Sequence, residues 1–227
     1  MRKEDKKKAV VLLSGGIDSA TCLAYATSRG YECHALSFDY RQRHRIELKC
    51  AKKIAKRFNS HEHIVVNLDL RKWGGSALTS SSIKVPKGGL KPGIPITYVP
   101  ARNMIFLSVA CAFAEARGIK EIFIGVNSLD YSGYPDCRPQ FIRSFEKTAN
   151  LGTKSGLEKK KIIIRTPLQK MEKWQIIKLA LSLGVDIGET NSCYDPGKNG
   201  SPCGKCDSCQ IRSNAIKRLG NSKTRIF

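Results

Sequence analysis

Short apolar runs alternate with longer amphipathic segments along most of the chain. Five runs have the length of strands: 10–13, 33–38, 64–68, 121–126 and 161–166. Five segments have the spacing of helices: 18–28, 45–58, 102–117, 139–149 and 173–183. In the second of these, Ile46, Ile54 and Phe58 fall on one face. The pattern therefore predicts strands and helices in regular alternation.

This alternation predicts an α/β protein with a doubly wound, mostly parallel sheet. The length of 227 residues suits one such domain. We assign residues 1–189 to it and residues 190–227 to a small C-terminal segment, whose helix from about Gln210 to Leu219 packs on the domain. Residues 71–100 are rich in Gly, Ser, Pro and Lys, which predicts a long irregular loop of the kind that often covers a site.

A glycine-rich hexapeptide, Ser14-Gly15-Gly16-Ile17-Asp18-Ser19, joins the first predicted strand to the first helix. A helix N-terminus offers unpaired N–H groups, and glycines let a phosphate approach the backbone. Asp18 suits a helix cap or a ligand to hydrated Mg²⁺. The Walker A and dinucleotide-binding spacings are absent from the loop. We therefore predict a nucleotide site formed by Leu13, Ser14, Gly15, Gly16, Ile17, Asp18, Ser19, Ala20, Thr21, Cys22 and Leu23.

Four of the nine cysteines cluster near the C-terminus, at Cys193, Cys203, Cys206 and Cys209. Four thiolates can close a tetrahedral structural zinc site, and the two Cys-x-x-Cys turns aim them at one ion. A redox pair is the alternative, since each Cys-x-x-Cys is a redox motif by itself. The cluster of four favours zinc.

The chain carries 40 Lys and Arg against 19 Asp and Glu, for a formal charge of +21. Such a field attracts phosphates, whether on ATP or on nucleic acid. The basic residues are scattered, however, as they are on ordinary solvated faces. Charge alone therefore decides nothing about a nucleic-acid partner. No apolar run is long enough to span a bilayer or to form a signal core, so we expect a cytoplasmic protein.

The hexapeptide resembles the phosphate loop of the ATP pyrophosphatase (PP-loop) superfamily, whose members cleave ATP between its α and β phosphates. Three further segments, 37–44, 98–103 and 125–138, occur in the order found in the QueC family of 7-cyano-7-deazaguanine synthases. Together with the cysteines, they make the chain similar to that family over nearly its whole length. Departures are Arg41, where the family usually has Gly, Gln140, where Glu is common, and one extra residue between Cys193 and Cys203.

The resemblance implies an adenine nucleotide alpha hydrolase-like fold and a ligase that forms carbon–nitrogen bonds. The implied substrates are 7-carboxy-7-deazaguanine, ammonia and ATP with Mg²⁺. The resemblance also implies a homodimer and no requirement for nucleic acid. The implied catalytic residues are Asp18, Ser19, His44 and Arg102. The implied substrate-binding residues are Tyr40, Gln42, Arg43, Asp130, Tyr131, Asp136 and Arg138.

Other reactive side chains have plain interpretations. We interpret Cys137 as packing, because adenylation needs no thiol nucleophile, and Lys173 as a solvated lysine at a helix start. His61 and His63 flank a strand edge and have no predicted role. Two other functions stay open: a PP-loop enzyme that modifies tRNA, and a non-enzymatic zinc-bearing module that binds nucleic acid.

Overall fold

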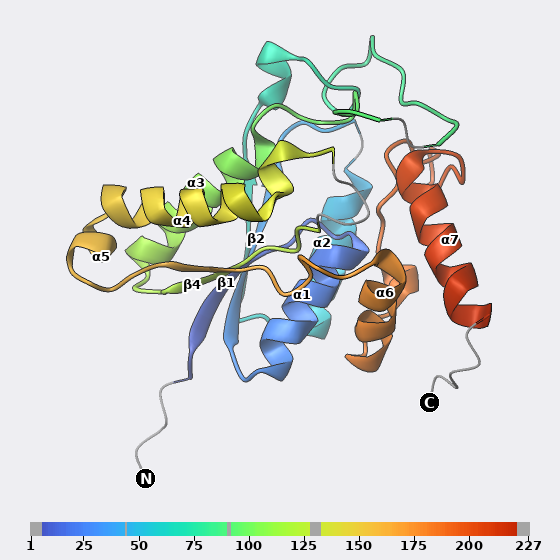
Figure 1. The fold of residues 1–227 in the computed structure, drawn as a ribbon. Coiled ribbons are helices and arrows are strands. Elements are labelled where there is room, and N and C mark those ends of the chain that lie inside the picture. The colour runs from blue at the N-terminus through green and yellow to red at the C-terminus, as the bar shows by residue number, and fades with distance from the viewer. Residues whose placement is uncertain (1–5, 44, 90–91, 128–132, 222–227) are drawn as a thin grey trace.

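Five parallel strands form one sheet in the order β3-β2-β1-β4-β5 (Figure 1). The computed structural model describes residues 6–43, 45–89, 92–127 and 133–221. The strands are β1 (Lys8–Leu12), β2 (Glu32–Asp39), β3 (Glu62–Asn67), β4 (Glu121–Phe123) and β5 (Ile163–Arg165). The bounds of all five strands lie within two residues of the predicted runs, except that β4 ends three residues earlier than predicted. The doubly wound α/β prediction is confirmed.

Seven α-helices lie in the described ranges: α1 (Ile17–Ser28), α2 (Ile46–Arg57), α3 (Arg102–Ala116), α4 (Pro139–Gly152), α5 (Lys154–Leu157), α6 (Lys173–Ser182) and α7 (Asp207–Asn221). The sequence did not predict α5, because a single turn is too short to show a helical period. Thr153 caps that turn by accepting a hydrogen bond from Gly156 N at 3.3 Å. The C-terminal helix α7 begins three residues before its predicted start and includes Cys209.

The sheet separates two apolar cores, because successive side chains of a strand point to opposite faces. Ala9 and Val11 of β1 pack with α1, α2, α6 and α7. Val10 and Leu12 pack instead with α3 and α4. Figure 1 shows α1, α6 and α7 on one side of the strands and α3 and α4 on the other. Helices on both faces leave the two strand edges and the strand ends as the places where a site can form.

After a short 3₁₀ turn, Leu70–Trp73, the described residues 74–89 and 92–100 are irregular. They are held by hydrogen bonds to the rest of the chain: the Arg43 guanidinium donates to Ile83 O at 2.9 Å. Ala77 and Val85 pack against Cys193 and Cys206. The segment therefore connects the carboxyl edge of the sheet to the cysteine cluster, and its predicted role as a lid stays a prediction.

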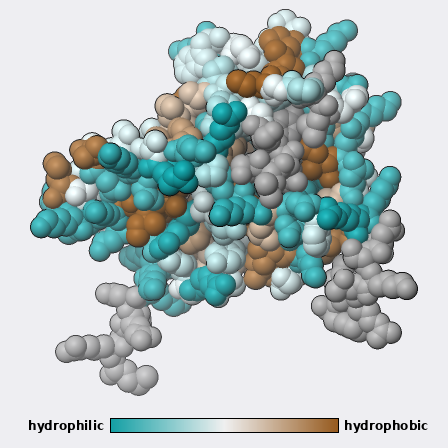
Figure 2. All heavy atoms as spheres, in the orientation of Figure 1, coloured by the Kyte–Doolittle hydropathy of each residue, from teal (hydrophilic) through white to brown (hydrophobic). Residues whose placement is uncertain are grey.

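The face in Figure 2 is mostly hydrophilic, with apolar side chains in separate small patches. The most exposed large apolar side chains include Leu151 and Leu157 around α5 and Trp73 and Ile94 in the irregular segment. Among the described residues, no helix combines the length and the apolar character needed to cross a membrane.

Gly15, in the loop before α1, is packed tightly against the backbone of α2, and a substitution at this glycine tests that packing. Gly15 has φ +90°, and a Cβ there would lie 2.1 Å from the Glu47 carbonyl oxygen. Gly15→Ala should lower the free energy of unfolding by about 3 kcal/mol or more, because both the φ and the overlap are unfavourable. The matched control is Gly30→Ala, with φ +80° and no atom within 4 Å of the new Cβ. It should cost only about 1 kcal/mol. Equal losses in urea unfolding would contradict the packing argument.

Candidate active site

A cavity of about 280 Å³ opens at the carboxyl ends of β1 and β2. Leu12, Leu36 and Phe38 form its apolar floor, and the loop before α1 forms one wall. Arg102 at the start of α3 and Lys173 at the start of α6 also line it. In doubly wound sheets this edge, next to the point where strand order reverses, is where ligands bind. Here β1 lies between β2 and β4, so the cavity occupies that place.

The phosphate loop is organised around one hydroxyl. The Oγ of Ser19 accepts hydrogen bonds from Ser14 N at 3.1 Å and from Gly15 N at 3.2 Å, and it lies 3.0 Å from Ser14 Oγ. Its own hydrogen donates to Gly16 O at 3.0 Å. The loop N–H groups thus already face an oxygen, which is the geometry that a phosphate oxygen needs.

Two other segments hold this loop from outside. Asn191 N donates to Gly15 O at 3.0 Å, and Ile17 N donates to Ser192 Oγ at 3.4 Å. Two residues after β4, a Cβ on Gly125 would lie 2.9 Å from the carbonyl oxygen of Asp18. The loop is therefore fixed by the chain just before Cys193 and by close backbone contact with the segment that follows β4.

Asp18 and Lys173 form an ion pair in the wall of the cavity. The Lys173 Nζ lies 2.8 Å and 2.7 Å from the two carboxylate oxygens of Asp18. The lysine side chain is only 15% exposed. The interpretation of Lys173 as solvated was wrong: α6 begins at the lysine, and α6 packs against α1, which begins beside Asp18. The pair places a cation beside the loop where phosphates would lie.

A second polar group, formed by Tyr40, Gln42, Glu47 and Arg102, lines the same cavity. Gln42 Nε2 donates to Glu47 Oε1 at 2.7 Å, and Gln42 Oε1 accepts from Tyr40 N at 3.0 Å. Arg102 donates to the Tyr40 hydroxyl at 3.4 Å. Burial raises the pKa of Glu47 to about 7, although the Gln42 hydrogen bond and the Arg102 charge oppose the rise. Burial also raises the pKa of Tyr40 to about 12.

Arg41 adopts a left-handed backbone conformation with φ 62°. Its N–H donates to Asp39 Oδ1 at 3.1 Å, which closes a tight turn after β2. A residue other than glycine is disfavoured in this conformation because its Cβ crowds the backbone. The turn geometry therefore gives a backbone reason for the glycine usual in the family, independent of the arginine charge.

Asp136 and Cys137 lie under the start of α3. Asp136 is 5% exposed, and its Oδ2 accepts from Asn103 N at 2.9 Å, as a cap of that helix. Burial raises the pKa of Asp136, opposed by the Asn103 hydrogen bond. Burial raises the pKa of Cys137 to about 12, so its thiol stays protonated at neutral pH. Cys137 packs in the apolar core and also lines the cavity, so its interpretation as packing stays a prediction. Asp136 is outside the residues that line the cavity.

The remaining predicted site residues are distributed unevenly. Arg43 lines the cavity edge, but its guanidinium is engaged by the carbonyls of Ala77 and Ile83. Arg138 is exposed at the start of α4 and does not line the cavity. His44, Asp130 and Tyr131 lie outside the described residues.

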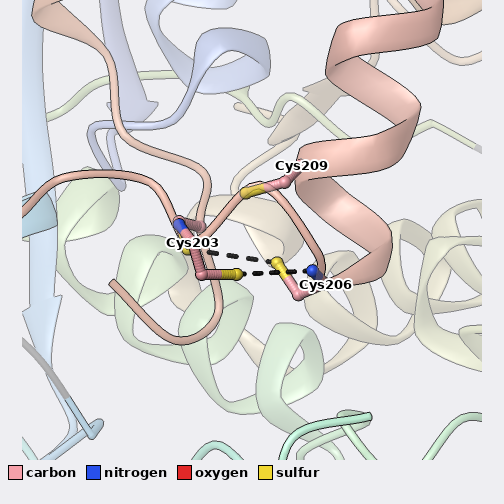
Figure 3. A group of neighbouring side chains, drawn as sticks. Cys203, Cys206 and Cys209 are labelled. Carbon is pink, nitrogen blue, oxygen red and sulfur yellow. Dashed lines mark hydrogen bonds between the residues drawn. The ribbon is translucent and has the colours of Figure 1, made fainter. Parts of the chain in front are cut away.

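The four clustered cysteines come together in space. Their sulfur atoms all lie within 4.8 Å of one another, and Cys193 Sγ is 4.0 Å from Cys206 Sγ. Figure 3 shows the sulfurs of Cys203, Cys206 and Cys209 directed toward a common centre. Backbone N–H groups point at the sulfurs: Cys203 N donates to Cys193 Sγ, and Cys206 N donates to Cys203 Sγ, each at 3.3 Å. Such N–H groups stabilise thiolates, so the cluster suits a metal ion.

The sheet order and the loop before α1 define the class of protein, an α/β fold of the PP-loop type. Two solved structures share the fold. One is the NMN synthetase from Francisella tularensis, with a TM-score of 0.53 and 15% identity, covering 98% of this chain and 80% of that one. The other is a 4-thiouridine synthetase in complex with RNA and bound ATP, with a TM-score of 0.52 and 19% identity, covering 95% of this chain and 51% of that one.

The particular family follows from closer relatives. The model of the queuosine biosynthesis protein QueC matches residues 8–220. A 7-cyano-7-deazaguanine synthase from Geotalea daltonii is 56% identical over 216 residues, covering 95% of this chain and 94% of the relative. Another from Pseudomonas syringae pv. tomato is 53% identical over 223 residues, covering 98% of both. The chain belongs to the QueC family and is an enzyme of queuosine biosynthesis.

Sequence reasoning missed Glu47, Lys173 and Ser192 as site residues. Glu47 is the fifth residue after Gln42 and lies on the first turn of α2. A helix that begins directly after the 37–44 segment therefore places Glu47 beside Gln42 at the cavity. For Lys173 and Ser192 the signal is absent from the local sequence, because their partners are 155 and 175 residues away.

Glu47 should make stability depend on pH. Its folded pKa of about 7 lies above the ordinary value of 4.5, so its contribution is fully present below pH 4.5 and is lost as pH rises through 7. We expect the free energy of unfolding to fall by about 2 kcal/mol more between pH 5 and pH 8 in the wild type than in Glu47→Gln, which has no proton to lose. Urea unfolding at both pH values measures this. Parallel pH profiles for the two proteins would contradict it.

Proposed function

We propose that this chain converts 7-carboxy-7-deazaguanine and ammonia into 7-cyano-7-deazaguanine with ATP. One observation carries the proposal: a single cavity holds the phosphate loop with Asp18 and Lys173 on one wall and the Gln42, Glu47 and Arg102 group on another. Such a cavity can bring an adenine nucleotide and a polar heterocycle into contact. Family membership over residues 8–220 supports the choice of reaction.

The reaction requires two activations of the same carbon. A carboxylate oxygen of the substrate attacks the α-phosphorus of ATP, and pyrophosphate leaves. Ammonia then attacks the acyl carbon, AMP leaves with the former carboxylate oxygen, and an amide forms. The amide oxygen attacks a second ATP in the same way, and loss of AMP and a proton leaves the nitrile. Each round uses one ATP and releases AMP and pyrophosphate.

The phosphate side of the cavity would bind and stabilise the leaving pyrophosphate. The N–H groups of Gly15 and Gly16 and the Ser14 and Ser19 hydroxyls now bond to one another within the loop, and a bound phosphate would take over these hydrogen bonds. The Lys173 ammonium would neutralise the phosphate charge. Asp18 is the carboxylate that fits Mg²⁺ here, and the ion when bound would offset phosphate charge. Because Lys173 already pairs with Asp18, it would exchange partners when a nucleotide binds.

The other wall would recognise the heterocycle. A guanidinium pairs well with a carboxylate, so Arg102 suits the carboxyl group of the substrate. A carboxylate accepts from the ring N–H and amine of a guanine-like base. Glu47 is the acid of that cavity wall, while Asp136 is used as the cap of α3. We therefore assign this recognition to Glu47 among the described residues.

Asp18→Ala should abolish the activity without unfolding the chain. Incubation with Mg·ATP, ammonium and 7-carboxy-7-deazaguanine, followed by mass spectrometry, should give the nitrile, AMP and pyrophosphate with the wild type. We expect kcat to fall about 100-fold or more in Asp18→Ala, because the loop loses its acid beside the phosphates. Asp69→Ala, which removes a partly exposed acid paired with Arg71, is the control and should keep full activity.

Two outcomes would overturn the assignment. A well-folded wild type that leaves the carboxylic acid intact but consumes ATP with tRNA would favour the tRNA-modifying alternative. A chain that binds nucleic acid and consumes no ATP with any substrate would favour the binding module. The homodimer stays a prediction, which sedimentation of the full chain tests.

We also propose that Cys193, Cys203, Cys206 and Cys209 hold a structural Zn²⁺. Four sulfurs at about 2.3 Å from one ion lie about 3.8 Å apart. The 4.0 Å between Cys193 and Cys206 is close to that value. With four protein ligands no position is open to substrate, so the ion would act by fixing α7 and the segment before it. On this proposal residues 190–227 form a zinc-binding extension of the domain.

Loss of one thiolate should destabilise this extension. Cys206→Ser should remove most of the bound zinc, measured by atomic absorption, and lower Tm by about 10 °C, because zinc binding is coupled to folding. Cys50→Ser changes a half-buried cysteine outside the cluster and is the matched control. If Cys206→Ser kept one zinc per chain and an unchanged Tm, the structural site would be refuted.

A further inference from the structure

A second group of metal-ligating side chains lies at the opposite end of the sheet from the cavity. Glu32 and His34 stand at the start of β2, and His61 directly precedes β3. One ligand atom from each lies within 4.8 Å of the others. His34 is five residues before Asp39 on the same strand, so the group is about 16 Å from the carboxyl edge of the sheet.

The geometry within the group is that of a site with one carboxylate and two imidazoles. The two oxygens of Glu32 face one histidine each: Oε1 lies 3.5 Å from His34 Nε2, and Oε2 lies 3.8 Å from His61 Nδ1. The two imidazole rings are 4.8 Å apart between centroids and tilted by 45°. Ligands of a tetrahedral ion at about 2.0–2.1 Å are about 3.4 Å apart, so small side-chain movements would bring these atoms onto one ion.

The orientation of His34 gives an independent indication of a ligand. Its Nδ1 lies 2.7 Å from Glu62 Oε1, and Glu62 is in turn held by Arg117 at 2.7 Å. A carboxylate only accepts hydrogen bonds, so Nδ1 carries the hydrogen. This is the carboxylate–histidine arrangement that orients metal-binding imidazoles.

The other ring nitrogen of His34, Nε2, is the atom that could bind a metal ion. The residue is 4% exposed, and Nε2 is a buried polar atom with no hydrogen-bond partner among the described residues. A buried nitrogen without a partner is costly, and it points toward Glu32 and His61. A cation between these three side chains would satisfy it.

We propose that Glu32, His34 and His61 bind one first-row divalent transition-metal ion, separate from the cysteine site. Imidazole and carboxylate ligands suit such ions, and Ca²⁺ and Mg²⁺ prefer oxygen ligands only. The ion would join the start of β2 to the start of β3 at their amino ends. Lys8, whose Nζ is 3.9 Å from Glu32 Oε1, opposes binding, but its side chain is 54% exposed and can turn away.

The test is calorimetric titration of untagged, zinc-loaded protein with Ni²⁺, which leaves the cysteine site filled. We expect one Ni²⁺ per chain with a micromolar Kd. His61→Asn and Glu32→Gln should each weaken binding about 10-fold or more, since each removes one of three ligands. Glu158→Gln removes an acid paired with Lys154 and Lys160 elsewhere and should leave Kd unchanged.

Thermal unfolding gives a second readout that does not depend on activity. At Ni²⁺ concentrations about ten times Kd, Tm should rise by about 3 °C in the wild type and not in His61→Asn. The His61 side chain is 57% exposed, so that variant should fold normally. Absence of saturable binding up to millimolar Ni²⁺ would overturn the proposal. Binding that survives both substitutions would overturn it as well.

Discussion

The site depends on backbone segments that approach one another more closely than any side chain would permit. The loop before α1 touches the α2 backbone at Gly15, where a Cβ would be 2.1 Å from the Glu47 carbonyl. At Gly125, two residues after β4, the chain touches the first turn of α1, and a Cβ there would be 2.9 Å from the Asp18 carbonyl. These contacts bring the N–H groups of the loop, the Glu47 carboxylate on α2 and the apolar ends of β1 and β2 around one cavity.

The fold was largely predictable because its determinants are local. Each strand is a short apolar run, and each helix except α5 has a clear apolar face or a glycine after its end. The ends of elements were predicted less accurately where tertiary contacts determine them. The strand β4 ends at Phe123, three residues before the apolar run does, because Gly125 packs against α1 and the chain leaves the sheet. The start of α7 follows Cys206, whose position is fixed by the cysteine cluster.

The site was predictable in its motifs and not in its long-range pairs. The phosphate loop and the four cysteines are contiguous or closely spaced, so their residue types and spacing carry the chemistry. Lys173 gave no such signal, since only the packing of α6 on α1 brings it to Asp18. Asp136 is the opposite case. It lies in a motif whose resemblance implies contact with the substrate, whereas in the structure its carboxylate caps α3 within the core. The assignments at His44, Asp130 and Tyr131 stay predictions.

The hydrogen bond that Ser192 accepts from the phosphate loop has a consequence for folding during synthesis. Ser192 follows Ile17 by 175 residues, so a ribosome that adds 5–20 residues per second completes the contact roughly 10–35 s after the loop itself. During that interval, the nascent chain has the glycine-rich turn without its outer support. The loop therefore gains its full set of hydrogen bonds only after translation of the segment that precedes Cys193.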